Sequence, residues 1–365
     1  MATGTKNRIR TTTHKNTVSF LRKMPTLLTI SSIIISFCIA LLTLPYWIRR
    51  ARSAKLAGPD VHKIKKPLVA ELGGLCVVAG FLVSLLFFVA TKTFVYQWPE
   101  NVLYIFATIA AVLIATMIGF VDDILGWKIG LRARYKIALT FFISLPIAVI
   151  NAGQSSMNLP FIGIVEFGIV YPLLLVPFGI MGAANGFNMI AGYNGLEAGQ
   201  GLIILIALTV MTYLGGSTYA ALIGSCMAAA LLAFYIFNKY PAKIFPGDTL
   251  TYPVGAVIAI VAILGNVEKY ALILFIPYFI EFVLKARGKL VKESFALVKD
   301  DGTLENRYEK WYGIEHVAVD LLREWRGKAT EQSVVHTVFT FQIFFALCSV
   351  GLYLISYYSL WLYFL

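Results

Sequence analysis

The groups best suited to chemistry in this sequence are carboxylates and carboxamides that stand at the ends of long apolar runs. The first is the pair Asp122 and Asp123, which closes the stretch that begins at Gly119. Two adjacent anions repel each other unless a cation or a proton relieves them. The pair therefore predicts a divalent-cation site or an acid/base pair, with a solvated helix end as the plainer alternative.

A second polar stretch, Asn185 to Gln200, interrupts an apolar run with asparagines, glycines and the carboxylate of Glu197. Polar groups at membrane depth are costly unless they line a cavity or a site. The asparagines Asn185, Asn188 and Asn194 therefore predict the floor of a site at a membrane surface. The alternative is a tight, Gly- and Asn-rich loop between two membrane helices.

Two further carboxylates lie next to apolar runs. Asp248 belongs to the turn Phe245 to Thr249, which leads straight into an apolar run. It can cap the helix that follows, or it can point at a metal shared with the first two stretches. Glu71 stands within the start of another apolar run, beside two glycines, where an unpaired carboxylate would be expensive.

The elements that must position these groups follow from composition. With 59% hydrophobic and 14% charged residues, the chain is too apolar for a set of soluble domains. We predict an all-α, polytopic integral membrane protein with a basic N-terminal tail at 1–26 and a single membrane domain at 27–365. Ten apolar runs predict about ten transmembrane helices. They cover 27–48, 68–90, 101–121, 137–150, 168–187, 201–215, 217–238, 252–265, 270–284 and 334–363.

The basic residues divide unevenly between the two sides of this predicted bundle. Connections that follow odd-numbered helices hold 23 Lys and Arg residues, whereas those that follow even-numbered helices hold 2. The positive-inside rule therefore places the odd-numbered connections, and every polar cluster described above, in the cytosol. The six basic residues of the N-terminal tail oppose this assignment, because an even number of helices puts both termini outside.

The largest connection, the cytosolic loop 285–333 between helices 9 and 10, is predicted to be a solvated connector or a small amphipathic lid. Within it, Glu315 to Arg323 is predicted to form an amphipathic helix at the interface, with His316 as a surface residue. The net charge of +12 favours anionic lipid headgroups or phosphate-bearing substrates as partners. No nucleic acid is expected, because basic and aromatic residues are not interleaved.

Three of these motifs together resemble the polyprenyl-phosphate N-acetylhexosamine-1-phosphate transferase family, which is glycosyltransferase family 4. The motifs are 119–123, 185–200 and 245–249, and the resemblance covers about 27–284. The segment Asn194 to Gly199 looks like the dolichol-type branch of eukaryotes and archaea, the UDP-GlcNAc:dolichyl-phosphate GlcNAc-1-phosphate transferases. The loop at 58–63 is similar, more loosely, to that of the bacterial MraY relatives.

The resemblance implies a Mg²⁺-dependent enzyme, with Mn²⁺ as a substitute. Its expected partners are UDP-GlcNAc, a polyprenyl or dolichyl phosphate and the lipid bilayer, and a homodimer is compatible with the family. The products would be UMP and the lipid-diphosphate-linked sugar that starts N-glycan assembly. We expect the plasma membrane of an archaeon, with the endoplasmic reticulum membrane as the alternative and the active site facing the cytosol.

The resemblance also implies roles for individual residues. Asp248 and Asn188 are the expected metal ligands, and Asp122 and Asp123 are expected to organise the nucleophile and the metal. For Asp122 we favour a positioning role over a base or covalent role, because a phosphate monoester is already largely dianionic near neutral pH.

The remaining expected site residues bind substrate. Lys136 is the candidate for neutralising the diphosphate, with Arg132 and Arg134 as rivals. The other candidates are Glu71 and Asn194 for the uridine, Asn185, and a basic residue such as Arg287 in the stretch 285–292.

Two alternatives remain at this stage. The same chemistry could use undecaprenyl phosphate or another UDP-N-acetylhexosamine in cell-envelope synthesis. A transporter is the competing class, because ten helices and a polar break near the bilayer are ordinary in transporters. Transporters of this size often contain matched internal repeats. No second copy of the 185–200 pattern or of the Asp122-Asp123 pair occurs, which favours an enzyme.

Overall fold

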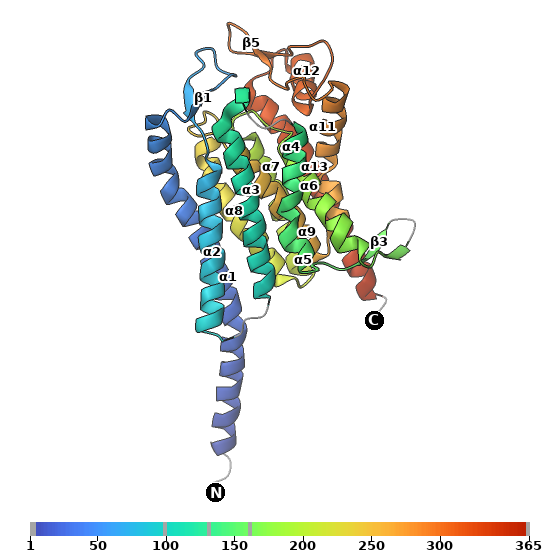
Figure 1. Ribbon diagram of the computed structural model, residues 1–365. Coiled ribbons are helices and arrows are strands. Elements are labelled where there is room, and N and C mark those ends of the chain that lie inside the picture. The colour runs from blue at the N-terminus through green and yellow to red at the C-terminus, as the bar shows by residue number, and fades with distance from the viewer. Residues whose placement is uncertain (1–4, 98–100, 130–132, 160–162, 363–365) are drawn as a thin grey trace.

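The computed structural model describes residues 5–97, 101–129, 133–159 and 163–362. The chain forms an upright bundle of helices, with short paired strands only in the connections (Figure 1). Within the described residues, seven helices are long and apolar enough to cross a membrane. They are α1 (Thr5–Ser53), α2 (Gly74–Phe94), α3 (Val102–Ile129), α7 (Leu196–Leu214), α8 (Thr218–Asn238), α9 (Asp248–Gly265) and α13 (Glu331–Leu362).

The other three predicted helices are each built from shorter pieces. They are α4 (Ala133–Phe141) with η1 (Phe142–Ser144) and α5 (Leu145–Val149), η2 (Tyr171–Leu175) with α6 (Val176–Phe187), and α10 (Glu268–Leu274) with α11 (Ile276–Arg287). A proline lies in the first turn of α5, η2, α6 and α11. Because proline lacks an N–H and its ring crowds the preceding turn, it favours a break at these points.

Short antiparallel strand pairs occupy three connections. They are β1 (Ala57–Pro59) with β2 (Leu68–Ala70), β3 (Ser156–Leu159) with β4 (Gly163–Glu166), and β5 (Leu297–Val298) with β6 (Leu304–Glu305). The first pair corrects the predicted helix 68–90, because residues 68–70 pair with β1 and the helix begins only at Gly74. Glu71 therefore lies in the link between β2 and α2, not inside a helix.

The polar connections gather at one end of the bundle. The β1–β2 pair, the β5 strand and α12 (Ile314–Arg326) lie at the upper end in Figure 1, whereas α1 begins, and α13 ends, at the lower end. We call this polar end the upper end. The charge count predicts that the odd-numbered connections share one side, and the structure brings them together there. The start of α1 and the end of α13 at the opposite end agree with an even number of crossings.

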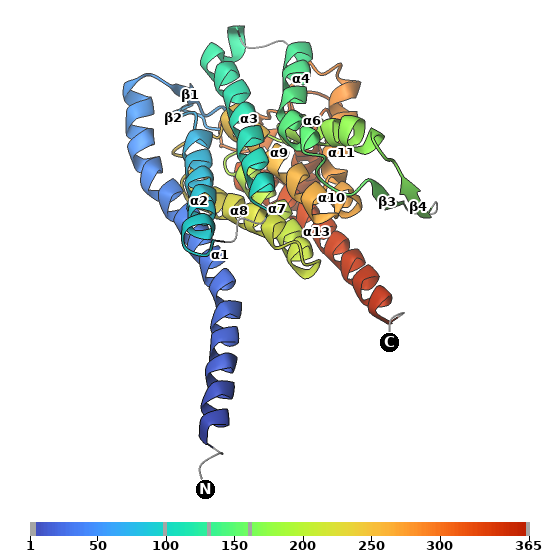
Figure 2. The same cartoon turned by 60° about the horizontal axis from the view of Figure 1, so that its bottom comes forward.

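Helix α9 lies at the centre of the bundle, among α2, α3, α6, α7 and α8 (Figure 2). Beyond its first turn its residues are apolar on every side, and nearly all of them are buried, as expected for a helix surrounded by protein. Two glycines let its first turn approach its neighbours. A Cβ at Gly119 in α3 would collide with the Asp248 carbonyl oxygen, and one at Gly74 in α2 would collide with the backbone of Thr249 and Leu250.

The close approach of α3 and α9 generates a stability prediction. We expect Gly119→Ala to lower the thermal unfolding midpoint of the protein in detergent, at a cost of about 1–3 kcal/mol, because a backbone atom cannot move aside cheaply. Gly182→Ala in α6 is the matched control, because nothing lies within 4 Å of its Cβ position. Equal midpoints for the two variants would contradict the close packing.

Candidate active site

Asp123 fixes the first turn of α9 from the neighbouring helix α3. Its carboxylate accepts hydrogen bonds from the backbone N–H groups of Asp248, at 2.8 Å, and Thr249, at 3.0 Å. The first N–H groups of a helix have no partner within the helix, so a carboxylate that accepts them caps it. Sequence reasoning offered a capping role for Asp248 itself, whereas the structure gives the capping contact to Asp123. The contact places the Asp248 side chain at the upper end of the bundle.

Lys136 joins the two remaining aspartates. Its Nζ lies 2.5 Å from Asp122 Oδ2 and 3.2 Å from Asp248 Oδ2. One ammonium thus relieves the repulsion between carboxylates that come from α3 and α9. The structure therefore brings together Asp122, Asp123, Lys136 and Asp248, which the sequence placed in one predicted site, although Asp248 follows Lys136 by 112 positions.

A cavity of about 460 Å³ opens beside Asp248, whereas Asp122, Asp123 and Lys136 are not among its lining residues. Asn188, Gly192, Glu197, Asp248 and Lys285 are among its lining residues. They come from the connection after α6, from the first turns of α7 and α9, and from α11. The volume lies within the range of small-molecule sites. A ligand in the cavity would meet carboxylate, carboxamide and ammonium groups together.

The cavity offers two protein oxygens that suit a hard divalent cation. Asp248 and Asn188 both line it, and the Asn188 Oδ1 accepts a hydrogen bond from Thr251 Oγ1 at 2.9 Å, which orients the carboxamide. Among the described side chains, no group of three or more His, Cys, Asp or Glu is arranged to hold a metal ion. The residues therefore fit Mg²⁺ that takes most of its ligands from water and substrate phosphates, and do not form a complete protein cage.

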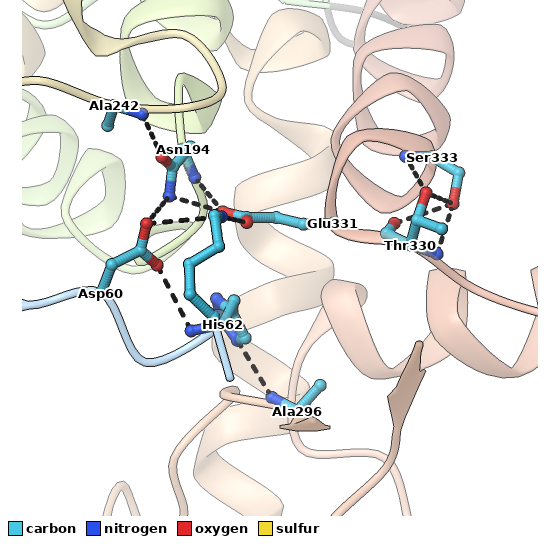
Figure 3. Close-up of polar contacts among 9 residues, drawn as sticks. Asp60, His62, Asn194, Ala242, Ala296, Thr330, Glu331 and Ser333 are labelled. Atoms are coloured by element: carbon cyan, nitrogen blue, oxygen red, sulfur yellow. Dashed lines mark hydrogen bonds and ion pairs between the residues drawn. The ribbon is translucent and has the colours of Figure 1, made fainter. Parts of the chain in front are cut away.

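Asn194 lies at the centre of a buried polar network (Figure 3). Its Nδ2 donates to Glu331 Oε1 at 2.6 Å and to Asp60 Oδ2 at 3.2 Å, and its Oδ1 accepts from the Ala242 N–H at 2.5 Å. Lys63 pairs with both Asp60 and Glu331. We call these five residues the Asn194 network. It joins the connection after α1, the connection after α6, the connection after α8 and the first residue of α13.

These bonds bear on the prediction that Asn194 contacts the uridine. Both amide hydrogens and one lone pair of the carboxamide oxygen are engaged by protein groups. What the geometry supports directly is that Asn194 links three connections and the start of α13 near the cavity. Sequence reasoning assigned no site role to Glu331, nor to Lys63, which it noted only as part of the motif at 58–63. The one available signal for Glu331 was an acidic residue just before the last apolar run.

Next to this network, His62 stacks on Tyr193, with 4.0 Å between the ring centroids. Its Nε2 accepts a hydrogen bond from the Ala296 N–H at 3.3 Å, as Figure 3 also shows. Burial lowers the pKa of His62 to about 4, since removal from water disfavours the charged imidazolium. His62 is therefore neutral near pH 7, as its acceptor role requires.

Other predicted site residues lie apart from the cavity. The Asn185 Nδ2 donates to Thr140 Oγ1 at 2.6 Å, between α6 and α4. Glu71 is half-buried, and burial raises its pKa. Neither these two residues nor Arg287, which is exposed at the end of α11, is among the residues that line the cavity.

Two predicted rivals of Lys136 are not placed. Arg132 lies outside the described residues, and the side chain of Arg134 does so too. In the stretch 285–292, the basic residues that line the cavity are Lys285 and Lys292.

One correction concerns the loop 285–333. The predicted amphipathic helix exists as α12, but His316 is fully buried and is not a surface residue. Its Nδ1 accepts from the Tyr312 N–H at 3.1 Å, and burial lowers its pKa to about 4. The side of α12 that carries His316 therefore packs against protein.

Comparison with known proteins supplies a family. Residues 104–266 match the model of glycosyl transferase family 4. The chain is 36% identical over 320 residues to a Saccharolobus solfataricus protein named as a UDP-N-acetylglucosamine–dolichyl-phosphate N-acetylglucosaminephosphotransferase, an alignment that covers 87% of this chain and 94% of that protein. It is 30% identical over 268 residues to the Dictyostelium discoideum enzyme of the same type, covering 63% and 64%.

A bacterial relative is similar over a comparable part of the chain. The phospho-N-acetylmuramoyl-pentapeptide-transferase of a Streptococcus pyogenes strain is 32% identical over 267 residues, covering 70% of this chain and 78% of the relative. The matched family region, 104–266, includes the two aspartates of α3, Lys136, Asn188 and Asp248.

The buried His62 generates a pH prediction. Its pKa is about 4 in the folded protein and 6.5 ordinarily, so the unfolded chain binds more protons between these values. The contribution of neutral His62 to the free energy of unfolding is therefore complete above about pH 6.5. It decreases by roughly 3 kcal/mol as the pH falls towards 4. We expect the unfolding midpoint of the wild type to fall more steeply across this window than that of His62→Phe, which keeps a stacking ring.

The control for this titration is His336→Gln, because His336 is exposed. That variant should retain the pH dependence of the wild type. A His62→Phe protein whose midpoint follows the wild-type curve from pH 6.5 to 4 would show that His62 does not titrate as its burial requires.

Proposed function

The chain belongs to glycosyl transferase family 4, and from this membership we propose that it transfers N-acetylglucosamine 1-phosphate from UDP-GlcNAc to a polyprenyl phosphate of the dolichyl type. The products are UMP and a lipid-diphosphate-linked sugar. The observation that carries the proposal is the alignment with the Saccharolobus solfataricus relative, which spans 94% of that protein. The cavity beside Asp248 supplies a site of the right size and charge at one end of the membrane bundle.

The reaction is a single displacement at phosphorus. A phosphate oxygen of the lipid acceptor forms a bond to the β-phosphorus of the donor, and the bond from that phosphorus to the bridging oxygen breaks. UMP leaves with the bridging oxygen and its electron pair. A phosphate monoester has a second pKa of about 6, so the acceptor is largely dianionic near neutral pH and needs no general base. The protein contributes positioning and charge more than covalent chemistry.

The roles of the clustered residues follow from their contacts. Lys136 is fixed between Asp122 and Asp248, so its ammonium is ready to offset phosphate charge without a search for a rotamer. Asp122 acts through Lys136 and is a positioning residue in this scheme. Asp123 is engaged with the first turn of α9 and serves the site by holding Asp248 in place.

We further propose that Mg²⁺ serves the reaction, with Mn²⁺ as a substitute. Asp248 and Asn188 would hold it, because both line the cavity and Thr251 orients the Asn188 carboxamide. When bound, the ion would offset the negative charge on the donor diphosphate. Two protein ligands suit Mg²⁺, which keeps several waters and binds substrate phosphates.

We also propose which side of the membrane the cavity faces and in which membrane the protein lies. The connections at the upper end carry most of the Lys and Arg residues, so the positive-inside rule turns the cavity towards the cytosol. The relative with the longest alignment described here is archaeal, which supports the plasma membrane of an archaeon. The Dictyostelium discoideum relative supports the endoplasmic reticulum membrane as the alternative.

A second candidate keeps the chemistry and changes the substrates. The Streptococcus pyogenes relative, named a phospho-N-acetylmuramoyl-pentapeptide-transferase, favours a different UDP-sugar and undecaprenyl phosphate in cell-envelope synthesis. The longer alignment with the Saccharolobus solfataricus relative favours the dolichyl-type substrates.

The function is tested on purified protein in detergent, given UDP-GlcNAc, dolichyl phosphate and Mg²⁺. We expect release of UMP, because the bond that breaks joins the β-phosphorus of the donor to the oxygen that bridges its two phosphorus atoms. A chelator should stop the release, and added Mg²⁺ should restore it. Release of UDP would mean that the sugar alone is transferred. Substituting undecaprenyl phosphate and other UDP-N-acetylhexosamines distinguishes the second candidate.

A variant at the centre of the cluster tests the site. Asp248→Ala should lower kcat by at least about 100-fold, because it removes a proposed metal ligand and one partner of Lys136. The protein should remain folded, since the capping contact uses the Asp248 backbone N–H and not its side chain. Asp300→Ala, at an exposed position of the loop 285–333, is the control and should retain activity. Turnover by Asp248→Ala near the wild-type rate would remove Asp248 from the reaction.

A further inference from the structure

A fully buried carboxylate lies behind the cavity wall, outside the cluster around Asp248. Glu281 in α11 has no exposed surface. Its Oε1 lies 3.3 Å from Lys285 Nζ, and its Oε2 accepts the backbone N–H of Ile314 at 2.6 Å. It thus joins α11 to the first residue of α12. A buried charge is expensive unless it is paired and hydrogen-bonded, so this carboxylate depends on both partners.

Its partner Lys285 lines the cavity, as does Ser294. The Lys285 ammonium donates to Ser294 Oγ at 3.0 Å in addition to its ion pair with Glu281. An ammonium has three N–H donors; one is donated to Ser294 Oγ, and the ion pair with Glu281 does not use up the others, so donors remain for a ligand in the cavity. The two protein contacts fix the direction of a side chain that would otherwise be flexible.

Other charged residues that line the cavity are engaged differently. Asp60 pairs with Lys63 at 3.3 Å, and Glu293 pairs with Arg307 at 2.7 Å. The Lys292 Nζ lies over the Tyr308 ring, 4.6 Å from its centroid. Lys285 differs from Lys292 because its counter-ion lies in the protein interior, behind it. A ligand can therefore approach Lys285 without displacing that counter-ion.

A second buried glutamate, Glu315, lies close to this group, because a Cβ at Gly313 would meet both Ser294 Oγ and Glu315 Oε2. Burial raises the pKa of Glu315 well above its ordinary value. The ion pair of Lys285 in this group is made with Glu281, at 3.3 Å.

We propose that Glu281 is a positioning residue for the reaction, which holds the Lys285 ammonium at the cavity wall so that it meets the diphosphate of a nucleoside diphosphate sugar. The inference rests on the proposed function, because it takes its ligand from there. Lys285 lies on α11, so it adds a fixed cation from a different element than Lys136 on α4. Pre-fixing this side chain avoids the loss of rotamer freedom on binding, which for lysine is among the largest.

The test is a double-mutant cycle on the full-length protein in detergent. Glu281→Gln keeps an oxygen that accepts the Ile314 N–H and removes only the charge. We expect Glu281→Gln and Lys285→Met each to raise KM for UDP-GlcNAc about 10-fold with kcat within about 2-fold, the pattern of lost ground-state binding. The double variant should match Lys285→Met alone, because Glu281 acts through Lys285.

Two further variants serve as a control and as a second test of how Lys285 is positioned. Glu305→Gln, which removes charge from an exposed ion-pair network on β6, should leave KM unchanged. Ser294→Ala removes the other contact of Lys285 without touching Glu281 and should raise KM about 3-fold, so it carries the test if Glu281→Gln does not fold.

The outcomes distinguish failure of this inference from failure of the proposed function. Wild-type protein that binds UDP-GlcNAc while Glu281→Gln or Ser294→Ala binds it equally well would overturn this inference and leave the proposed function standing. Additive effects in the double variant would also overturn it. Wild-type protein that does not bind UDP-GlcNAc would overturn the proposed function and this inference with it.

Discussion

The structure depends on the contact between the first turn of α9 and the end of α3. Gly119 allows the Asp248 backbone to approach α3, and Asp123 then accepts the N–H groups that begin α9. Because α9 is the central helix, this contact fixes the depth at which it starts. The Asp248 side chain is consequently held at the cavity and within reach of Lys136. The carboxylate of Asp123, which caps α9, thus positions the carboxylate of Asp248, which is proposed to hold the metal.

Around this contact, most polar residues form hydrogen bonds and ion pairs that hold the connections to one another. The Asn194 network joins three of them to the start of α13, and Glu281 joins α11 to α12. These groups are buried, so each must find a partner or lose the free energy of its hydration. The arrangement explains how long connections at a membrane surface can hold a defined cavity. It also explains why several polar residues of the predicted site contact protein more than they face the cavity.

The sequence predicted the ten apolar segments and the shared end of the polar connections, because crossing a bilayer imposes length and composition on each segment. It also grouped Asp122, Lys136 and Asp248, through motif resemblance. It did not predict β2, since a three-residue strand is defined by its distant partner. Nor did it predict the burial of His316 or the partners of Glu331, because amphipathic periodicity shows that a helix has two faces but not what covers the second one.

In the proposed reaction, the cavity beside α9 receives the nucleotide sugar. A structure of the protein determined with UDP-GlcNAc and Mg²⁺ tests it most directly. We expect the diphosphate in the cavity at the upper end, with Asp248 and Asn188 on one side and Lys285 on the other. A donor bound at the lower end of the bundle, or with its diphosphate away from Asp248, would contradict it.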